Sequence, residues 1–405
     1  TVDRLIAPPD DSRWSVTGQG TGSLAESTGA RTFVTFTGNE EIVGGAGADT
    51  LVGPDANTDW TLDGAGQGPR SAPSRPTVLA AFTGMENLAG GSQDDTLAGP
   101  EANTDWAVDG AGQGTVTDPS GPTVLATFSG MENLAGGSQT DTLAGPDANT
   151  NWALDGAGQG TVTDPSGPTA LAAFTGFEDL TGGSQVDTFS VGSSGSWNGT
   201  IDGGGGSDTV EITGQGVFRI DGSSVSTAAN PGDPALRTIN FAGVERVLAI
   251  GVGGGDQFDV TPSIGTAVEV QGGDPTDTIN IDLQGLDYVA VTTAGGTLGQ
   301  VTAVDTSGSP HVTYADVTFN VENVTLNNAG AVINTFGDRD DWLSGLEELV
   351  GLGARLETLD QLGAALPGLS DNTVTITENG PVFAGDVSLG KAAGIGDVLF
   401  QLSEE

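Results

Sequence analysis

Residues 82–127 read FTGMENLAGGSQDDTLAGPEANTDWAVDGAGQGTVTDPSGPTVLAT, and residues 128–173 repeat this stretch with few changes. Landmark residues recur every 46 positions: the tryptophans are Trp14, Trp60, Trp106 and Trp152, and the phenylalanines are Phe36, Phe82, Phe128 and Phe174. A repeat of this length is typical of stacked architectures, in which each unit buries its apolar face against its neighbours. It predicts an elongated molecule.

Short apolar runs alternate with turn residues inside each repeat. Thr123–Phe128, for example, is rich in Val, Leu and Thr and lies between Gly/Pro-rich segments, as short β-strands do. Forty-six residues are too many for one coil of a small solenoid and suit two coils of about 21 and 25 residues. The pattern therefore predicts an all-β, right-handed parallel β-helix with 46-residue two-coil repeats. Equivalent residues should then form straight rows, one of Trp60, Trp106 and Trp152 and another of Phe82, Phe128 and Phe174.

The pattern divides the chain into three regions. Residues 1–190 form the regular repeats, and residues 191–335 continue the solenoid in degenerate form, because the spacing of Phe, Gly and Glu recurs at Phe241–Glu245 and, shortened, at Phe319–Glu322. In residues 336–405 leucines recur from Leu343 to Leu362 at three- and four-residue spacing, which predicts an amphipathic helix followed by short strands. We expect a small α/β C-terminal element that serves as a cap or a joint.

The chain is strongly acidic. Eleven Lys and Arg residues against 54 Asp and Glu residues give a net charge of −43. Such a charge repels nucleic acid and anionic membranes, and no apolar run reaches the ~20 residues of a membrane span, so we expect neither nucleic-acid binding nor membrane insertion. The charge points to cations as partners. Alternatively, it serves only solubility or adaptation to salt.

Two glycine-rich turns suggest which cation. Residues 44–52 (GGAGADTLV) and 203–211 (GGGGSDTVE) match the pattern G-G-x-G-x-D-x-U-x. They resemble the haemolysin-type (RTX) nonapeptide, and the resemblance implies a parallel β-roll or β-helix that binds Ca²⁺ between stacked turns. Ca²⁺ prefers six to eight oxygen ligands, which backbone carbonyls and aspartates can supply.

One turn supplies only half of such a site, so the best candidates are aspartates one coil apart. Asp187 and Asp208 are separated by 21 residues, as are Asp256 and Asp277. Asp49, Asp95 and Asp141 are weaker metal candidates, because the DGAGQG turns that follow them lack the final aspartate. In the alternative interpretation, these turns are satisfied by their own hydrogen bonds.

The wider arrangement also resembles known proteins. Segments such as LVGPDANTDWTLDGAGQG (51–68) and FTGMENLAGGSQDDTLAG (82–99) look like the repeat regions of very large secreted bacterial proteins, including adhesins and the LEPR-XLL type. The resemblance covers residues 1–335. It implies an extracellular or bacterial cell-surface location and a structural or adhesive role in a biofilm or matrix, with cell-surface glycans as a further partner.

Other interpretations of the repeated residues are weaker. The glutamates of the Phe-x-Gly-x-Glu segments are expected to accept backbone N–H bonds at corners rather than to form a catalytic array, and the tryptophans to fill the core rather than to form an exposed carbohydrate-binding row. His311 is the only histidine, and the usual nucleophile and metalloenzyme motifs are absent, so we expect no enzyme. A β-helix enzyme acting on polysaccharides through paired carboxylates is the alternative. An ice-binding face would need threonine rows in every coil, and here they occur once per repeat.

The chain is also expected to assemble with itself. Unpaired strand edges at the end of a solenoid invite pairing with another chain. We expect a head-to-tail contact between the coil from Asp3 to Trp14 and the C-terminal region of the next subunit, which would give a filament because nothing forces closure. Alternatively, the chain is a segment of a longer solenoid.

Overall fold

The computed structural model describes residues 3–39, 41–72, 75–121, 123–167, 170–274, 276–292, 298–308 and 310–333, with two further strands, β36 (Thr373–Thr375) and β37 (Asp386–Ser388). For residues 70–72, 75–79, 292, 298, 373–375 and 386–388 it describes the backbone alone. All regular secondary structure in these residues is β-strand, which confirms the all-β prediction for them.

The chain divides into two compact units. Unit 1 comprises Thr1–Leu286 and Val291–Gly330, and unit 2 comprises Asp287–Ala290 and Ala331–Glu405. In unit 2, β36 pairs antiparallel with β37. The helix predicted between Leu343 and Leu362 lies outside the described residues.

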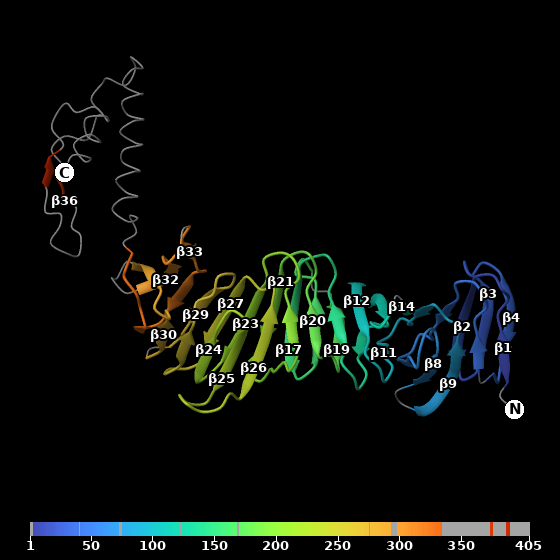
Figure 1. The fold of residues 1–405 in the computed structure, drawn as a ribbon. Coiled ribbons are helices and arrows are strands. Elements are labelled where there is room, and N and C mark those ends of the chain that lie inside the picture. The colour runs from blue at the N-terminus through green and yellow to red at the C-terminus, as the bar shows by residue number, and fades with distance from the viewer. Residues whose placement is uncertain are drawn as a thin grey trace, which may run out of the picture. The chain divides into compact units, whose positions relative to one another are not determined.

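Unit 1 is a stack of coils built from two long sheets (Figure 1). Sheet A runs, in order of pairing, through β1 (Arg4–Ile6), β5 (Glu41–Val43), β9 (Arg75–Thr83), β8 (Gly68–Ala72), β7 (Asp59–Thr61), β11 (Thr96–Ala98), β15 (Asn133–Ala135), β19 (Ala170–Thr175), β18 (Gln159–Thr163), β17 (Thr150–Gly156), β21 (Asp187–Val191), β23 (Thr209–Gly214), β27 (Arg246–Gly251), β29 (Ala267–Gln271), β34 (Val317–Asn320), β32 (Leu298–Asp305) and β33 (Val312–Thr313). It also contains β31 (Asp287–Thr292).

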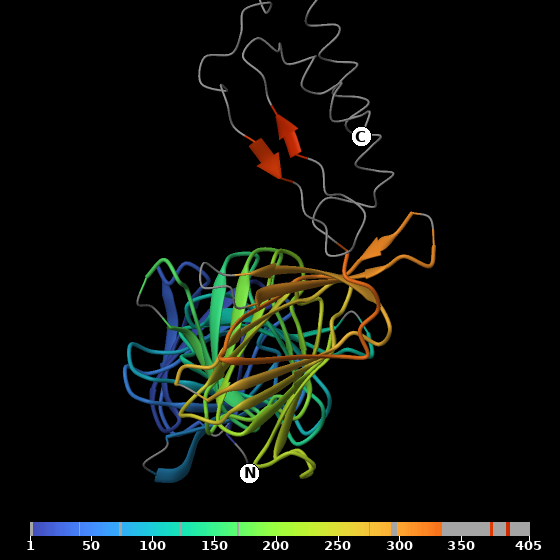
Figure 2. The same ribbon diagram turned by 90° about the vertical axis from the view of Figure 1, so that its left-hand side faces the viewer.

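Sheet B runs through β4 (Thr32–Phe36), β3 (Thr21–Glu26), β2 (Ser12–Gly18), β6 (Thr50–Val52), β10 (Asn87–Ala89), β14 (Val124–Ser129), β13 (Gln113–Thr117), β12 (Asp105–Gly110), β16 (Thr142–Ala144), β20 (Asp179–Thr181), β22 (Thr200–Asp202), β26 (Arg237–Ala242), β25 (Ser224–Ala228), β24 (Val217–Ile220), β28 (Gln257–Val260), β30 (Thr278–Asp282) and β35 (Asn323–Asn327). These pairings form an open path with β4 and β35 at its ends. Figure 2 looks along the stack, so that successive coils lie one behind another.

Each regular repeat makes three crossings between the sheets. The chain leaves β11 in sheet A, forms the antiparallel meander β12–β13–β14 in sheet B and returns to β15 in sheet A. The next repeat starts with β16 in sheet B and places its meander, β17–β18–β19, in sheet A. Because three crossings are one and a half turns, equivalent strands of successive repeats lie in opposite sheets.

The prediction of two coils per repeat is therefore wrong. Trp60 and Trp152 lie in sheet A and Trp106 in sheet B, so the three do not form one row. Phe82 and Phe174 likewise lie in sheet A, and Phe128 lies in sheet B. The meander is the physical reason, because it adds two strands on the same side of the solenoid without a crossing. The structural period is two sequence repeats.

Glycine makes the meander possible at two positions. Gly110 pairs with Gln113, which leaves Ala111 and Gly112 as a two-residue hairpin loop, and Gly112 has φ 62°. A residue with a Cβ rarely adopts that conformation. In β13, a Cβ on Gly114 would lie 2.8 Å from the ring of Phe128 and 2.0 Å from the carbonyl oxygen of Ala107. Only glycine lets the Phe128 ring lie across β13.

The recurring aromatic residues fill the space between the sheets. Trp14, Trp60, Trp106 and Trp152 are at most 1% exposed. In each repeat the tryptophan contacts the phenylalanine of its own meander: the ring centroids of Trp106 and Phe128 are 5.9 Å apart, and those of Trp152 and Phe174 are 5.8 Å apart. The tryptophans are thus core residues, as predicted, and do not form an exposed carbohydrate-binding row.

Two lengths of turn occur along the stack. A turn that contains a meander takes 37 residues, as from Thr96 to its neighbour Asn133 in sheet A. A turn without a meander takes 21 residues, as from Thr188 to Thr209 or from Gln257 to Thr278. The spacing of one coil predicted for Asp187/Asp208 and Asp256/Asp277 is confirmed by this register.

Candidate functional site

All seven aspartates predicted as metal ligands are buried at the start of strands. Each has at most 1% of its surface exposed. The alternation of sheets places them on two ladders: Asp49, Asp141, Asp256 and Asp277 enter strands of sheet B, and Asp95, Asp187 and Asp208 enter or begin strands of sheet A.

In the regular repeats the aspartate joins the backbone of neighbouring turns. Oδ1 of Asp141 accepts hydrogen bonds from the backbone N–H of Thr104 at 2.8 Å and from its hydroxyl at 2.5 Å. Oδ2 of Asp141 accepts the N–H of Gly137 at 2.6 Å. The backbone N–H of Asp141 in turn donates to Oε2 of Glu178 at 2.9 Å. We call this Thr–Asp–Glu arrangement, with its three residues spaced 37 apart, the corner bracket.

The corner bracket recurs along the stack. Ser12, Asp49 and Glu86 form it with serine in place of threonine. Asp187 keeps the bonds from Thr150 and Gly183, but its own N–H donates to Asp208 in place of a glutamate. Asp95 accepts the N–H of Gly91 at 2.6 Å. Burial raises the pKa of Asp95, and the hydrogen bond from Gly91 opposes that rise.

The glutamates accept backbone N–H bonds, which confirms the corner role predicted for them. Glu86, Glu132, Glu178, Glu245 and Glu322 accept the N–H of Asp49, Asp95, Asp141, Asp208 and Asp277, respectively, over 2.7–3.1 Å. Such bonds satisfy buried donors that would otherwise destabilise the fold.

Most of the regular aspartates do not fit a calcium site. Both carboxylate oxygens of Asp49, Asp141 and Asp187 already accept hydrogen bonds from the chain. An ion at any of them would have to displace two or three of those bonds and leave buried N–H groups without acceptors. These carboxylates therefore act as acceptors of structural hydrogen bonds.

The aspartates of the 21-residue turns are bonded differently. Oδ1 of Asp208 accepts the backbone N–H of Asp187 at 2.8 Å, and Oδ1 of Asp277 accepts that of Asp256 at 2.8 Å. An aspartate here takes the place that a glutamate holds in the longer turns. The Oδ2 atoms of Asp208, Asp256 and Asp277 are buried and have no hydrogen-bond partner among the described residues, and the same holds for Oδ1 of Asp95 in a regular repeat.

The surroundings of these carboxylates favour the protonated form. Burial raises the pKa of Asp208 to about 6; the N–H bond from Asp187 opposes the rise, and the carboxylates of Asp187, Glu245 and Asp202 add to it. Burial also raises the pKa of Asp187 and of Asp256. A buried carboxylate with a spare oxygen can gain either a proton or a cation.

The fit of calcium to the short turns is partial. Asp208 and Asp277 each bring one spare oxygen, whereas Ca²⁺ takes six to eight. Within the described part of the chain, no three His, Asp or Glu side chains gather around a single point as a metal would require. Further ligands would have to come from backbone carbonyls and water.

The sequence interpretation missed the hydroxyl partner of the corner bracket. Thr104 and Thr150 bond both the carboxylate and the indole of the same repeat, since Nε1 of Trp106 and Nε1 of Trp152 donate to the threonine Oγ1 atoms at 2.7 Å. The recurrence of threonine two residues before Trp60, Trp106 and Trp152 was a visible signal. Periodicity alone, however, does not say what such a threonine contacts.

Arg237 was also missed, because nothing in its sequence context repeats. Its guanidinium donates to the carbonyl oxygens of Gly192 at 2.5 Å, Gly195 at 2.6 Å and Thr213 at 2.5 Å. Burial lowers its pKa. Arg237 thereby fixes the loop where the regular repeats give way to the shorter turns.

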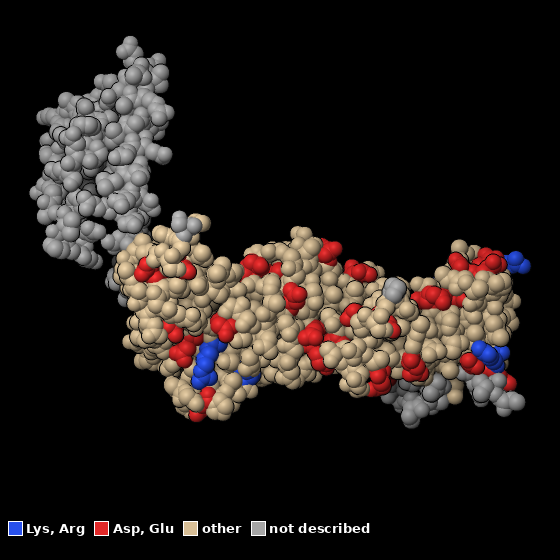
Figure 3. Space-filling model, in the orientation of Figure 1, with Lys and Arg blue, Asp and Glu red and all other residues tan. Residues whose placement is uncertain are grey.

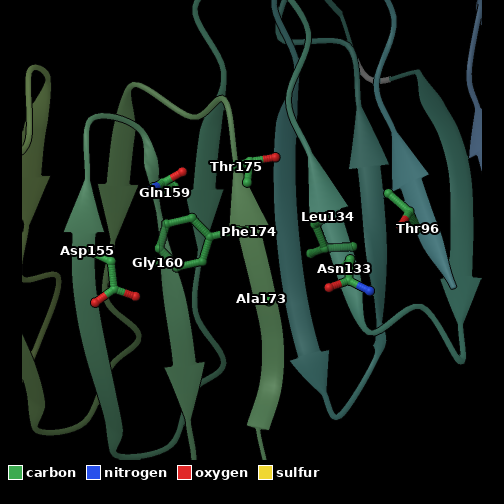
Figure 4. Close-up of a pocket in the computed structure, with 9 residues that line it drawn as sticks. All are labelled: Thr96, Asn133, Leu134, Asp155, Gln159, Gly160, Ala173, Phe174 and Thr175. Atoms are coloured by element: carbon green, nitrogen blue, oxygen red, sulfur yellow. The ribbon is translucent and has the colours of Figure 1, made fainter. Parts of the chain in front are cut away.

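Figure 4 shows a pocket in the described part of unit 1. It lies on sheet A and has a single carboxylate. It is lined by Thr96, Asn133, Leu134, Asp155, Gln159, Gly160, Ala173, Phe174 and Thr175. On the face drawn in Figure 3, acidic side chains are spread in small groups along unit 1.

Comparisons with known proteins give no functional assignment for this chain. No family model matches the chain, and no curated protein matches it. In the described residues no helix is long and apolar enough to cross a membrane.

Proposed function

We propose that the chain is an extracellular structural element, a stiff β-solenoid of a bacterial surface or matrix. The observation that carries the proposal is the corner bracket, in which the recurring polar residues bind the backbone of neighbouring turns. The recurring aromatic residues fill the core. The residues that recur in each repeat therefore contribute to a long and rigid fold. We take the coils to be right-handed, the usual hand of parallel crossovers.

Hydrogen bonds to charged acceptors supply the stiffness. Each contributes about 1.5–3 kcal/mol when it is made in the interior, and each repeat adds the same set. A solenoid of this kind can therefore be lengthened without a new core. The net charge of −43 keeps neighbouring molecules apart and in solution.

We propose calcium binding chiefly at the 21-residue turns. Asp208 and Asp277 are the candidate ligands, with Asp187 and Asp256 as the neighbours that they already contact. The buried Oδ2 atoms without described partners support this choice. Asp49 and Asp141 are left out of it, because both of their carboxylate oxygens accept bonds from the chain. Asp95 stays a weaker candidate, since its Oδ1 is buried without a described partner. Glycan binding through tryptophan has no support, because those side chains are buried.

Labelling of intact source cells tests the structural role. Antibodies raised against the full chain should bind the outside of unpermeabilised cells or the surrounding matrix in immunogold electron microscopy. Antibody absorbed beforehand with the pure protein is the control. Label confined to the cell interior would contradict the proposal.

A further inference from the structure

The pocket on sheet A is long for its volume. Its lining residues come from five adjacent strands, in the order β11, β15, β19, β18 and β17. The four spacings between these strands amount to about 19 Å along the stack. The volume is about 200 Å³, which is below the ~300–1,000 Å³ of most small-molecule sites. A pocket of this form suits a chain-like ligand better than a compact one.

The polar side chains of the pocket are available to a ligand. Thr96 and Asn133 lie toward one end of it, and Asp155 and Gln159 lie toward the other (Figure 4). The side chains of Thr96, Asp155 and Gln159 make no hydrogen bond with the described part of the chain. Asn133 makes only a long one, 3.4 Å from its Nδ2 to the carbonyl oxygen of Asp95. Amide and carboxylate groups each carry two polar atoms side by side, which can bond two neighbouring hydroxyl groups of a ligand.

Pairing of the strands excludes a peptide strand as the ligand. Each of the five strands that line the pocket is paired on both sides, since β11 also pairs with β7 and β17 also pairs with β21. None of them offers the free main-chain N–H and C=O groups that an added strand requires. The ligand must therefore bind to side chains.

Charge restricts the ligand further. Asp155 is the single carboxylate among the lining residues, and no lining residue is basic. The net charge of −43 repels anionic polymers. The other polar side chains are uncharged amides and hydroxyls, which suit an uncharged ligand rich in hydroxyl groups.

We propose that the pocket binds an uncharged polysaccharide, which lies across β11, β15, β19, β18 and β17 along the axis of the stack. The inference rests on the proposed structural role and deepens it, because it names the class of matrix polymer that the solenoid holds. The contacts are made at the surface, in competition with water, so that one pocket binds weakly.

The preceding repeat places equivalent residues on sheet B, with one difference in the middle of the pocket. Ala173 lies opposite Asn133, whereas Thr127 lies opposite Asn87. The larger side chain of Thr127 narrows the equivalent pocket. The alanine is therefore the residue that makes room on sheet A. The other corresponding residues, 46 positions earlier, are Thr50 for Thr96, Asp109 for Asp155 and Gln113 for Gln159.

Affinity electrophoresis of the full chain tests the proposal. A protein of net charge −43 migrates toward the anode in a native gel, and an uncharged polymer cast into the gel slows only a protein that binds it. At least one of dextran, laminarin, mannan and hydroxyethylcellulose should slow the wild type, whereas carboxymethyl-dextran should not. The proposal is overturned if none of the uncharged polymers slows the chain, or if carboxymethyl-dextran slows it equally.

Exchanges at the alanine position assign the binding to this pocket. Ala173→Thr copies the residue of the preceding repeat and should abolish the retardation, whereas Thr127→Ala should increase it by opening the pocket on sheet B. Gln159→Ala, at an exposed position, should weaken it. Thr188→Ala, on the outer face of β21 and outside the pocket, is the control and should migrate as the wild type does.

Melting temperatures show whether each variant keeps its fold. Unchanged retardation in Ala173→Thr or in Thr127→Ala overturns the assignment to the pocket. Polymer binding by the pure chain does not depend on where the chain is found, so this proposal and the immunogold result can fail separately.

Discussion

The regular repeats and the later coils use the same aspartate turn in different ways. In a 37-residue turn, Asp141 accepts bonds from Thr104 and Gly137, and Glu178 serves the N–H of Asp141. In a 21-residue turn, the carboxylate of Asp208 itself accepts the hydrogen bond from the N–H of Asp187. The N–H of Gly204, which corresponds to that of Gly137, bonds instead to Asp202.

In the short turns a carboxylate oxygen is left unused at Asp208 and Asp277, and in the regular repeats the same is true of Oδ1 of Asp95 alone. The Oδ2 of Asp208 is buried without a described partner, and the pKa of Asp208 rises to about 6. The comparison shows that the same turn aspartate bonds the neighbouring backbone through both oxygens at Asp49, Asp141 and Asp187, and keeps one buried oxygen free of described partners at Asp208 and Asp277.

Loss of a regular corner bracket should have the largest effect. Asp141→Ala leaves the N–H groups of Thr104 and Gly137 without acceptors in the interior and should lower the free energy of unfolding by about 4 kcal/mol. Urea denaturation measures it. Asp208→Ala, the matched change in a short turn, should cost about 1 kcal/mol or less, because it also removes a buried charge. Equal losses would contradict the comparison.

Loss of a corner glutamate should have an intermediate effect. Glu132→Ala leaves one buried N–H, that of Asp95, without its acceptor and should cost about 2 kcal/mol in the same urea experiment. Glu132→Gln keeps an oxygen in place and serves as the control. A glutamine variant as unstable as the alanine variant would show that the charge, not the hydrogen bond, matters.

Calcium should stabilise the chain modestly and through the short turns. At ten times its dissociation constant, a ligand that binds only the folded state adds about 1.4 kcal/mol. Calorimetry of the wild type should therefore show a higher melting temperature with calcium than with chelator, whereas Asp208→Asn should show a smaller rise. If calcium does not raise the melting temperature of the wild type, or raises that of the variant equally, the proposed calcium site is wrong.

The smallest predicted effect is the pH dependence of Asp208. Its folded pKa, about 6, lies above the ordinary value of 3.8, so its stabilising contribution is complete below pH 3.8 and is lost as the pH rises through about 6. With chelator present, Asp208→Asn should melt about 1–2 °C above the wild type at pH 8, for a burial of charge that costs about 1 kcal/mol in a unit of this length. The difference should shrink below pH 6. A difference independent of pH would show that Asp208 does not titrate there.

Much of the fold could be predicted from the sequence. Phe82, Glu86 and their equivalents recur at a spacing that indicates a solenoid, and the role of the glutamates as backbone acceptors followed from their position at corners. The 21-residue turn was also visible in the spacing of Asp187 and Asp208.

The meander was not predicted, because strand patterns do not reveal which sheet a strand joins. Gln113–Thr117 and Val124–Ser129 have the composition of parallel solenoid strands. Yet the first runs antiparallel beside β12, and the second runs antiparallel beside the first. The Gly110–Gln113 loop was the available signal, since two residues between strands favour a hairpin. The free Oδ2 of Asp208 was beyond prediction, because it depends on which N–H groups the neighbouring turn brings close.

Cysteine pairs test the central claim most directly, that each regular turn takes 37 residues and contains a meander. Thr96 and Asn133 lie opposite each other on adjacent strands of sheet A, whereas Thr117, 21 residues after Thr96, lies in sheet B. Adjacent strands lie close enough for a disulfide. Under oxidation the Thr96→Cys/Asn133→Cys chain should form an intramolecular disulfide, and the Thr96→Cys/Thr117→Cys chain should not. The reverse result would restore two coils per repeat and contradict the alternation of the sheets.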